Sequence, residues 1–333
     1  MPSLPRIKRP RSRTRAEEPV AAARREPAEL SANGLLLIHL DSPEQEVSTT
    51  LAERFGWHAL DVEDVHSKRQ RPKIDEYPEY IFGVLHFPFY DKAVQRLNAA
   101  ELDFFLGQGY LVTLPTVELL PVSRLFLRCV DDPELRESLF SKGSGYLLYH
   151  VLDDLFDYCF PILDKIGFKL DSIEDDVLEG RSEEAVRDIS NAKQEIISYR
   201  KIIKPQRPAL RLLERRVERF MPEELELYFD DLVDASERIW DLLDNYKEVV
   251  EALETTNEQV LSHRFNDVLR ILTVFSIVFL PATLIASLWG MNVGLPGGGN
   301  PATASTLEFW LIIGASVALI AAMLAYFRSK RWL

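Results

Sequence analysis

Two uncharged apolar runs near the end of the chain, residues 271–288 and 309–327, constrain its fold more than any other feature. They hold 18 and 19 residues without Asp, Glu, Lys or Arg. An α-helix needs about 20 apolar residues to cross a hydrocarbon core of about 30 Å. The sequence therefore predicts two transmembrane helices over these runs, with a lipid bilayer as their environment.

Basic residues flank these two runs on one side of the membrane. The connecting loop, residues 289–308, has no Lys or Arg, whereas Arg264 and Arg270 precede the first run and a basic segment, 328–333, follows the second. Because Lys and Arg are retained on the cytoplasmic side, both ends of the chain are expected there. We therefore expect an inner (plasma) membrane protein with two spans and a large cytoplasmic N-terminal part.

Composition excludes several other classes of protein. The two cysteines, Cys129 and Cys159, form no disulfide framework, as expected for a chain that faces a reducing cytosol. Residues 1–33 are read as a disordered basic tail, because they are rich in Arg, Pro and Ala and lack the apolar stretch of a secretory signal. The net charge of −13 argues against a nucleic-acid partner, whose phosphates require clustered cations.

Short strand-like and helical runs alternate over residues 34–145, which predicts a cytoplasmic α/β domain. Residues 146–221 then read as a helical hairpin whose arms are joined at Gly180. We expect Pro222 to open a stalk helix over 222–270 that continues into the first span. The predicted fold class is an α+β membrane protein with a long helical hairpin, a stalk helix and two C-terminal transmembrane helices.

A polar stripe runs along the first predicted span at alternating steps of three and four residues. Its members are Asn266, Leu269, Thr273, Ser276, Leu280, Thr283 and Ser287. One interpretation is a face that meets water, which requires several chains around a common axis, since two spans cannot enclose a pore. The other is contact between helices in lipid, with each hydroxyl bonded to the carbonyl four residues back.

Three segments resemble the CorA family of divalent-cation transporters. They are residues 266–273, residues 280–286 and the motif Trp289-Gly290-Met291-Asn292 at the outer end of the first span. Residues 70–77, residues 228–231 and the basic ending extend the likeness over nearly all of residues 35–333. The resemblance implies a funnel-shaped homopentamer whose stalk helices line the pore and whose α/β domains form the intracellular mouth.

The resemblance also implies a selectivity filter at Gly290, Met291 and Asn292. Magnesium dehydrates reluctantly, so neutral amide oxygens from five copies of Asn292 would accept hydrogen bonds from its water shell without holding it too tightly. Lower in the pore, apolar constrictions are expected at Leu269, Leu272 and Leu280, with Asn266 as a polar ring at the cytoplasmic exit.

The transported ion is expected to be Mg²⁺, with Co²⁺ or Ni²⁺ as further substrates. The loop after Asn292 reads Val293-Gly294-Leu295-Pro296-Gly297 and lacks the Met-Pro-Glu-Leu stretch of many magnesium members. This Gly-rich loop is closer to that of the zinc-transporting branch. That branch often replaces the Met of the motif, however, and Met291 is intact. None of the six histidines has a zinc-site spacing, so Zn²⁺ stays an alternative.

Three acids are candidates for metal-dependent gating. The resemblance places a regulatory carboxylate at Asp231 on the stalk and its partners at Glu63 and Asp64 in the α/β domain of a neighbouring subunit. A divalent ion between them would hold the pore closed, and the alternative is that they are solvated surface acids. Outside transport, the chain could be a non-conducting membrane sensor or scaffold. No nucleotide-binding or hydrolase motif is present, so we do not expect an enzyme.

Overall fold

The computed structural model describes residues 28–40, 44–67, 70–91, 96–222, 227–289 and 306–330. The chain divides into two compact units. The first combines the described residues up to Lys165 with Glu195–Asp244, and the second combines Ile166–Gln194 with the residues from Asn245 onward. Each unit is described by itself below.

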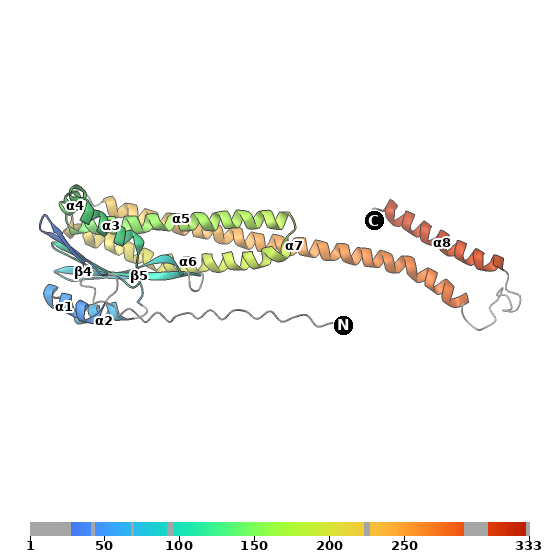
Figure 1. Cartoon of the computed structure of the whole chain (residues 1–333), viewed down its shortest axis with the longest axis horizontal. Helices are drawn as coiled ribbons and strands as arrows, with labels where there is room; N and C mark the ends of the chain where they lie inside the picture. The colour runs from blue at the N-terminus through green and yellow to red at the C-terminus, as the bar shows by residue number, and fades with distance from the viewer. Residues whose placement is uncertain are drawn as a thin grey trace, which may run out of the picture. The chain divides into compact units, whose positions relative to one another are not determined.

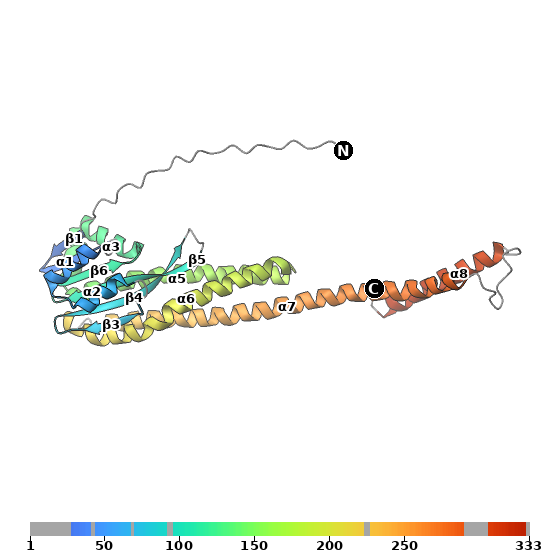
Figure 2. The ribbon, with the colours of Figure 1, turned by 90° about the horizontal axis from the view of Figure 1, so that it is seen from below.

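A six-stranded mixed sheet forms the centre of the first unit. Its strands follow the order β1-β2-β6-β5-β4-β3, with β2 and β6 parallel and every other pair antiparallel. The strands are β1 (Ala28–Ala32), β2 (Leu35–His39), β3 (Lys73–Glu76), β4 (Tyr80–Asp91), β5 (Arg96–Gly107) and β6 (Tyr110–Pro115). The predicted α/β domain is thus present as a sheet with helices on both faces (Figures 1 and 2).

Two short helices, α1 (Gln45–Phe55) and α2 (Ala59–His66), cover one face of the sheet. Alternation along the strands supplies the apolar side chains under them, including Phe82 of β4 and Phe105 of β5, both fully buried. The ring of Trp57, between the two helices, stacks on Phe105 with the ring centroids 3.6 Å apart. This packing fixes α2, which carries Glu63 and Asp64, over the sheet.

The opposite face of the sheet packs against longer helices. These include α5 (Ser144–Leu178), whose Phe156 contacts Phe87 of β4 edge to face, and α6 (Ser182–Val217), whose Gln206 accepts a hydrogen bond from the backbone of His86. Two shorter helices, α3 (Leu120–Asp131) and α4 (Pro133–Phe140), precede α5, and a 3-10 turn, η1 (Glu218–Phe220), follows α6. The predicted hairpin over 146–221 corresponds closely to α5 and α6.

The hairpin turns at Gly180, as the sequence predicts. Gly180 has φ +79°, a left-handed conformation that favours glycine. The amide of Arg181 donates to the carbonyl of Asp176 at 2.8 Å and that of Gly180 to Val177 at 3.1 Å, which satisfies the last carbonyls of α5. A side chain at Gly180 would also collide with the guanidinium of Arg264 on α7, within the same unit.

The long helix α7 (Leu227–Trp289) contains 63 residues and includes both the predicted stalk and the predicted first span. A second helix, α8 (Thr306–Ser329), contains the predicted second span. By length and apolar composition, α7 is the one described helix that could cross a membrane, and the apolar part of α8, Ile313–Ser329, is slightly shorter than that criterion.

The structure bears on two predicted boundaries. Pro222, which is expected to open the stalk helix, is itself not helical; α7 is described from Leu227, and residues 223–226 lie outside the described residues. The residue before Pro222, Met221, is extended, as steric conflict with a following proline favours. Strand β1 begins at Ala28, inside the segment 1–33 for which the sequence predicts a disordered tail, because its backbone pairs with β2 from Ala28 to Ala32.

Candidate functional site

The polar stripe of α7 lies on the exposed surface of the single chain. The stripe residues and the neighbouring Leu272 are all exposed: Asn266, Leu269, Leu272, Thr273, Ser276, Leu280, Thr283 and Ser287. The chemistry is mixed, since hydroxyls alternate with leucines along one side of the helix. Nothing in the described part of the second unit covers this side, so it is available to water, to lipid or to another copy of the chain.

The other side of the same helix is covered by α8. Val274 and Val278 are buried there and pack against Phe327, Ile320 and Met323. At 100° per residue, the middle of the polar stripe lies roughly opposite these two valines. The packing of α8 therefore leaves the hydroxyl-bearing side of α7 free, which is the arrangement that a pore-lining helix requires.

Three hydroxyls of the stripe bond to their own helix. Thr273 donates to the carbonyl of Leu269 at 2.7 Å, Ser276 to Leu272 at 2.9 Å and Thr283 to Phe279 at 2.8 Å. Each hydroxyl proton is thus used inside the helix, while the oxygen keeps lone pairs that can accept a hydrogen bond. These bonds are compatible with both interpretations of the stripe.

The predicted filter residues Gly290, Met291 and Asn292 lie outside the described residues. Helix α7 is described up to Trp289, immediately before them. Their assignment therefore rests on the sequence motif.

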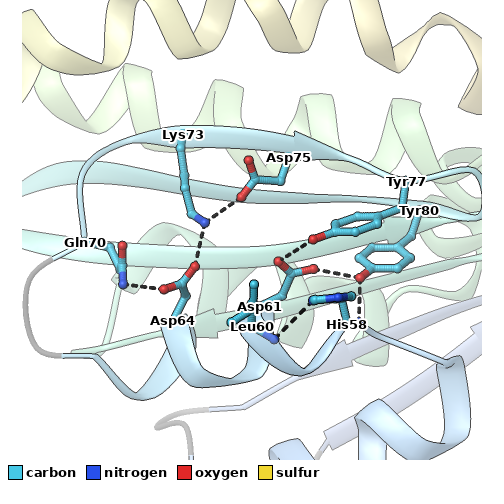
Figure 3. A network of polar contacts seen from close by, with 9 residues as sticks. All are labelled: His58, Leu60, Asp61, Asp64, Gln70, Lys73, Asp75, Tyr77 and Tyr80. Atoms are coloured by element: carbon cyan, nitrogen blue, oxygen red, sulfur yellow. Dashed lines mark hydrogen bonds and ion pairs between the residues drawn. The ribbon is translucent and has the colours of Figure 1, made fainter.

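Asp64 lies on α2 within a network of polar contacts between that helix and strand β3 (Figure 3). Its carboxylate accepts hydrogen bonds from Gln70 at 2.7 Å and from the ammonium of Lys73 at 2.6 Å. Lys73 also bonds to Asp75 at 2.5 Å. Partial burial lowers the pKa of Lys73, but the hydrogen bonds and charges of Asp64 and Asp75 together outweigh that effect and raise it.

Asp61, one helical turn before Asp64, is almost fully buried. It accepts hydrogen bonds from the hydroxyls of Tyr80 at 2.7 Å and Tyr77 at 3.0 Å. Burial raises the pKa of Asp61, and the two hydrogen bonds oppose that effect. Burial and the bond to Asp61 raise the pKa of Tyr77 to about 12. This network anchors the helix that carries Glu63 and Asp64.

Glu63 has a different setting on the same helix. It is exposed and lines a surface cavity of about 490 Å³ together with Gln45, Ala59, Val62, His66 and Ser67. Two sides of α2 thus carry acids in different settings, with Asp64 in an ion pair and Glu63 open to solvent.

Asp231 is exposed near the start of α7 and lies beside an acid that the sequence patterns did not identify. Burial, and then the negative charges of Asp157, Asp231 and Asp154, raise the pKa of Asp153 on α5 to about 6. Within one chain, the described contacts of Asp231 and Asp64 do not include each other. Asp153 escaped prediction because an acid on a long amphipathic helix is usually a solvated residue, and only its proximity to α7 distinguishes it.

Comparisons with known proteins agree with the fold. The family described as CorA-like Mg²⁺ transporter protein matches residues 32–331. The Cobalt/magnesium transport protein CorA of Thermotoga maritima is 28% identical over 294 residues, covering 86% of this chain and 80% of that protein. The protein of the same name from Methanocaldococcus jannaschii is 23% identical and covers 92% and 94% of the two chains.

A zinc relative and a solved structure complete the comparison. The Zinc transport protein ZntB of Pectobacterium atrosepticum is 22% identical over 68% of this chain and 75% of its own length. The complete structure of the CorA magnesium transporter from Methanocaldococcus jannaschii superposes with a TM-score of 0.78 at 21% identity, covering 92% of this chain and 94% of that one. The chain therefore belongs to the CorA-like Mg²⁺ transporter family, whose members are divalent-cation transporters and not enzymes.

Proposed function

We propose that the chain forms a homopentameric channel that takes up Mg²⁺ across the inner (plasma) membrane, with Co²⁺ and Ni²⁺ as further substrates. The observation that carries the proposal is the exposed polar stripe of α7, opposite the side packed against α8. In a ring of five chains, this side of each α7 would face the axis, and α8 would separate α7 from lipid. Residues 271–288 and 309–327 are then the two spans, with residues 289–308 outside the membrane.

The ion path begins at five copies of Asn292 and descends along the stripe. The amide oxygens of the filter accept hydrogen bonds from the ion's water shell, since Mg²⁺ gives up its waters reluctantly. Gly290 lets the backbone turn beneath that ring, and Met291 packs against neighbouring helices. Below it, the oxygens of Thr283, Ser276 and Thr273 offer acceptors, because their protons are donated back into the helix.

Leucines between the hydroxyls supply the constrictions of the pore. Leu269, Leu272 and Leu280 are exposed to 42%, 60% and 69% in the single chain. Five such side chains around a narrow axis exclude water and stop ions, and a small splay of the helices admits water again. Asn266 forms a further polar ring at the cytoplasmic exit.

Magnesium is favoured over zinc by the donors and by the relatives. The proposed filter offers amide oxygens, which suit hard cations, and no His or Cys, which zinc prefers. The two CorA relatives above are named for cobalt and magnesium transport, while the zinc relative matches a smaller part of the chain. The zinc alternative is settled by an uptake assay.

Gating is assigned to Asp231 together with Asp64 and Glu63 of the neighbouring subunit. The donors fit a divalent cation, because all three are carboxylates and Asp231 and Glu63 are exposed. The bound ion would offset the repulsion between acids across the interface. Its loss at low cytosolic metal would release the stalks, since a ligand that binds the closed state better shifts the population toward it.

Asn292→Ala tests the proposed channel in liposomes that contain the purified protein. Uptake of Mg²⁺, Co²⁺ and Zn²⁺, each offered alone, is measured for the wild type and the variant. We expect wild-type Mg²⁺ uptake to fall to background in the variant, whereas Asn300→Ala, a matched amide loss in the same loop, keeps most of it. Wild-type uptake by an assembled Asn292→Ala pentamer would refute the filter. Uptake of Zn²⁺ alone would favour the zinc alternative, and no uptake of any ion would favour a non-conducting sensor.

A further inference from the structure

Lys73 lies between two acids of the first unit and bonds to both (Figure 3). Its ammonium nitrogen is 2.6 Å from Oδ2 of Asp64 and 2.5 Å from Oδ2 of Asp75. Carboxylate oxygens of Asp61, Asp64 and Asp75 all lie within 4.8 Å of one another, a spacing that suits a cation. In the described structure, the cation at this place is the ammonium of Lys73.

A buried acid lies under this cluster. Asp103, on β5, is fully buried, and neither of its carboxylate oxygens has a hydrogen-bond partner among the described residues. Lys73 pairs with Val84 and Val84 with Asp103, which places all three in one row on one face of the sheet. The ion pairs of Lys73 are therefore those with Asp64 and Asp75, and the acid below them carries a raised pKa instead of a counter-charge.

The carboxylate of Asp64 is already engaged on both oxygens. Oδ1 accepts from Gln70 at 2.7 Å, and Oδ2 accepts from Lys73. A divalent ion can bind Asp64 in two ways. It either displaces the ammonium of Lys73 from Oδ2 or binds a carboxylate whose charge Lys73 already offsets. In both cases the ion and the ammonium repel each other.

We propose that Lys73 is a positioning residue that competes with the regulatory divalent cation for Asp64 and so raises the metal concentration at which the channel closes. The inference rests on the proposed function, because it takes Asp64 as a ligand of that cation. By linkage, binding of the metal weakens the Lys73–Asp64 ion pair by the same factor by which the pair weakens binding of the metal. The ion pair thus sets the metal threshold.

The test is a Mg²⁺ titration of protection from chymotrypsin, with the full-length protein in detergent micelles. Chymotrypsin is chosen because it does not cleave after Lys. Lys73→Gln should lower the Mg²⁺ concentration at half-maximal protection roughly tenfold, a typical coupling between sites. Lys73→Arg keeps the charge and should restore a midpoint close to that of the wild type. Lys201→Gln, an equal loss of charge at an exposed position on α6, should leave the midpoint unchanged.

The direction of the shift separates competition from a merely structural role. If Lys73 only holds α2 in place, Lys73→Gln would leave the midpoint unchanged or raise it, and either result would overturn the inference. A wild type without Mg²⁺-dependent protection would overturn the gating proposal and, with it, the competition, even where Asn292-dependent uptake persists. If Lys73→Gln does not fold, the double variant Lys73→Gln with Asp75→Asn is compared with the single variant Asp75→Asn. The Mg²⁺ concentration at half-maximal protection should then be roughly tenfold lower in the double variant.

Discussion

Thr273 donates its hydroxyl proton to the carbonyl oxygen of Leu269, 2.7 Å away on the preceding turn of α7. The bond leaves the hydroxyl oxygen facing outward as an acceptor on the exposed side of the helix. A hydrated cation presents only hydrogens to its surroundings, so a line of acceptors is chemically matched to it. The same bond would satisfy the hydroxyl in lipid, and accessibility therefore decides between the two interpretations.

Single cysteines along α7 should distinguish the two sides of the helix. In the assembled protein, cysteines at Thr273, Ser276 and Thr283 should react with a charged aqueous thiol reagent at least roughly tenfold faster than cysteines at Val274 and Val278, which α8 covers. The rates are compared in a background without Cys129 and Cys159, both buried. Equal rates on the two sides would mean that the hydroxyls only join helices.

The proposed gating role of Asp64 and Asp231 is tested by a double substitution. Asp64→Ala with Asp231→Ala should weaken Mg²⁺-dependent protection from proteolysis and raise the internal Mg²⁺ concentration that stops uptake, by roughly tenfold or more. The reason is that the variant loses the carboxylates that the ion would bridge, although it also loses their repulsion. Asp171→Ala with Asp241→Ala, an equal loss of charge at other acids, serves as the control. Unchanged protection and unchanged inhibition in the double variant would place gating elsewhere.

Much of the sheet could be predicted because its strands are marked by apolar runs. Apolar runs rich in aromatic and β-branched residues begin at Tyr80 and Tyr110, and strands β4 and β6 begin at these residues. Strand β1 could not be predicted, because Ala28–Ala32 has no β-branched or aromatic residue. Its conformation comes from the unpaired edge of β2, which is a tertiary effect.

The side of the stalk that packs was less predictable. A spacing of three and four residues fits apolar positions along the stalk: Ile239, Leu242, Tyr246, Val249, Leu253 and Val260. Ile239 and Leu253 are buried, but Val249 is 36% exposed, while Leu243 and Val250, outside this spacing, are fully buried. Neighbouring sides of a mixed helix fit such a spacing almost equally well, and only the packing partner selects one. Near the site, the motif containing Lys73 was recognised, but its ion pair with Asp64 depends on where α2 lies on the sheet.

The bond from Tyr80 to Asp61 should contribute measurably to stability. Tyr80 is 2% exposed, donates to Asp61 at 2.7 Å and accepts from the backbone of His58 at 2.8 Å. Tyr80→Phe removes both bonds and leaves the buried carboxylate of Asp61 with only the bond from Tyr77, which costs about 2 kcal/mol. Thermal unfolding of the full-length protein should show a lower midpoint. Tyr90→Phe, at a side chain that is 49% exposed, should change it little, and equal midpoints for both variants would contradict the role of the bond.

Asp103 should make the stability of the protein depend on pH. Burial, followed by the negative charges of Glu101 and Asp64, holds the pKa of Asp103 well above its ordinary value of 3.8. The folded chain therefore keeps a proton on Asp103 at pH values where the unfolded chain has released it. Stability falls as the pH rises from about 4 toward the folded pKa, because the unfolded state binds fewer protons in that window.

Asp103→Asn removes this dependence, since the amide is neutral at every pH and has nearly the same shape. The unfolding midpoint of the variant should exceed that of the wild type by about 3 °C or more at pH 8, and the difference should shrink at pH 5. Asp171→Asn removes a carboxylate at an exposed position on α5. Its difference in unfolding midpoint from the wild type should not shrink between pH 8 and pH 5. A lower midpoint for Asp103→Asn at both pH values would mean that Asp103 is held as a carboxylate, with Lys73 as its counter-charge.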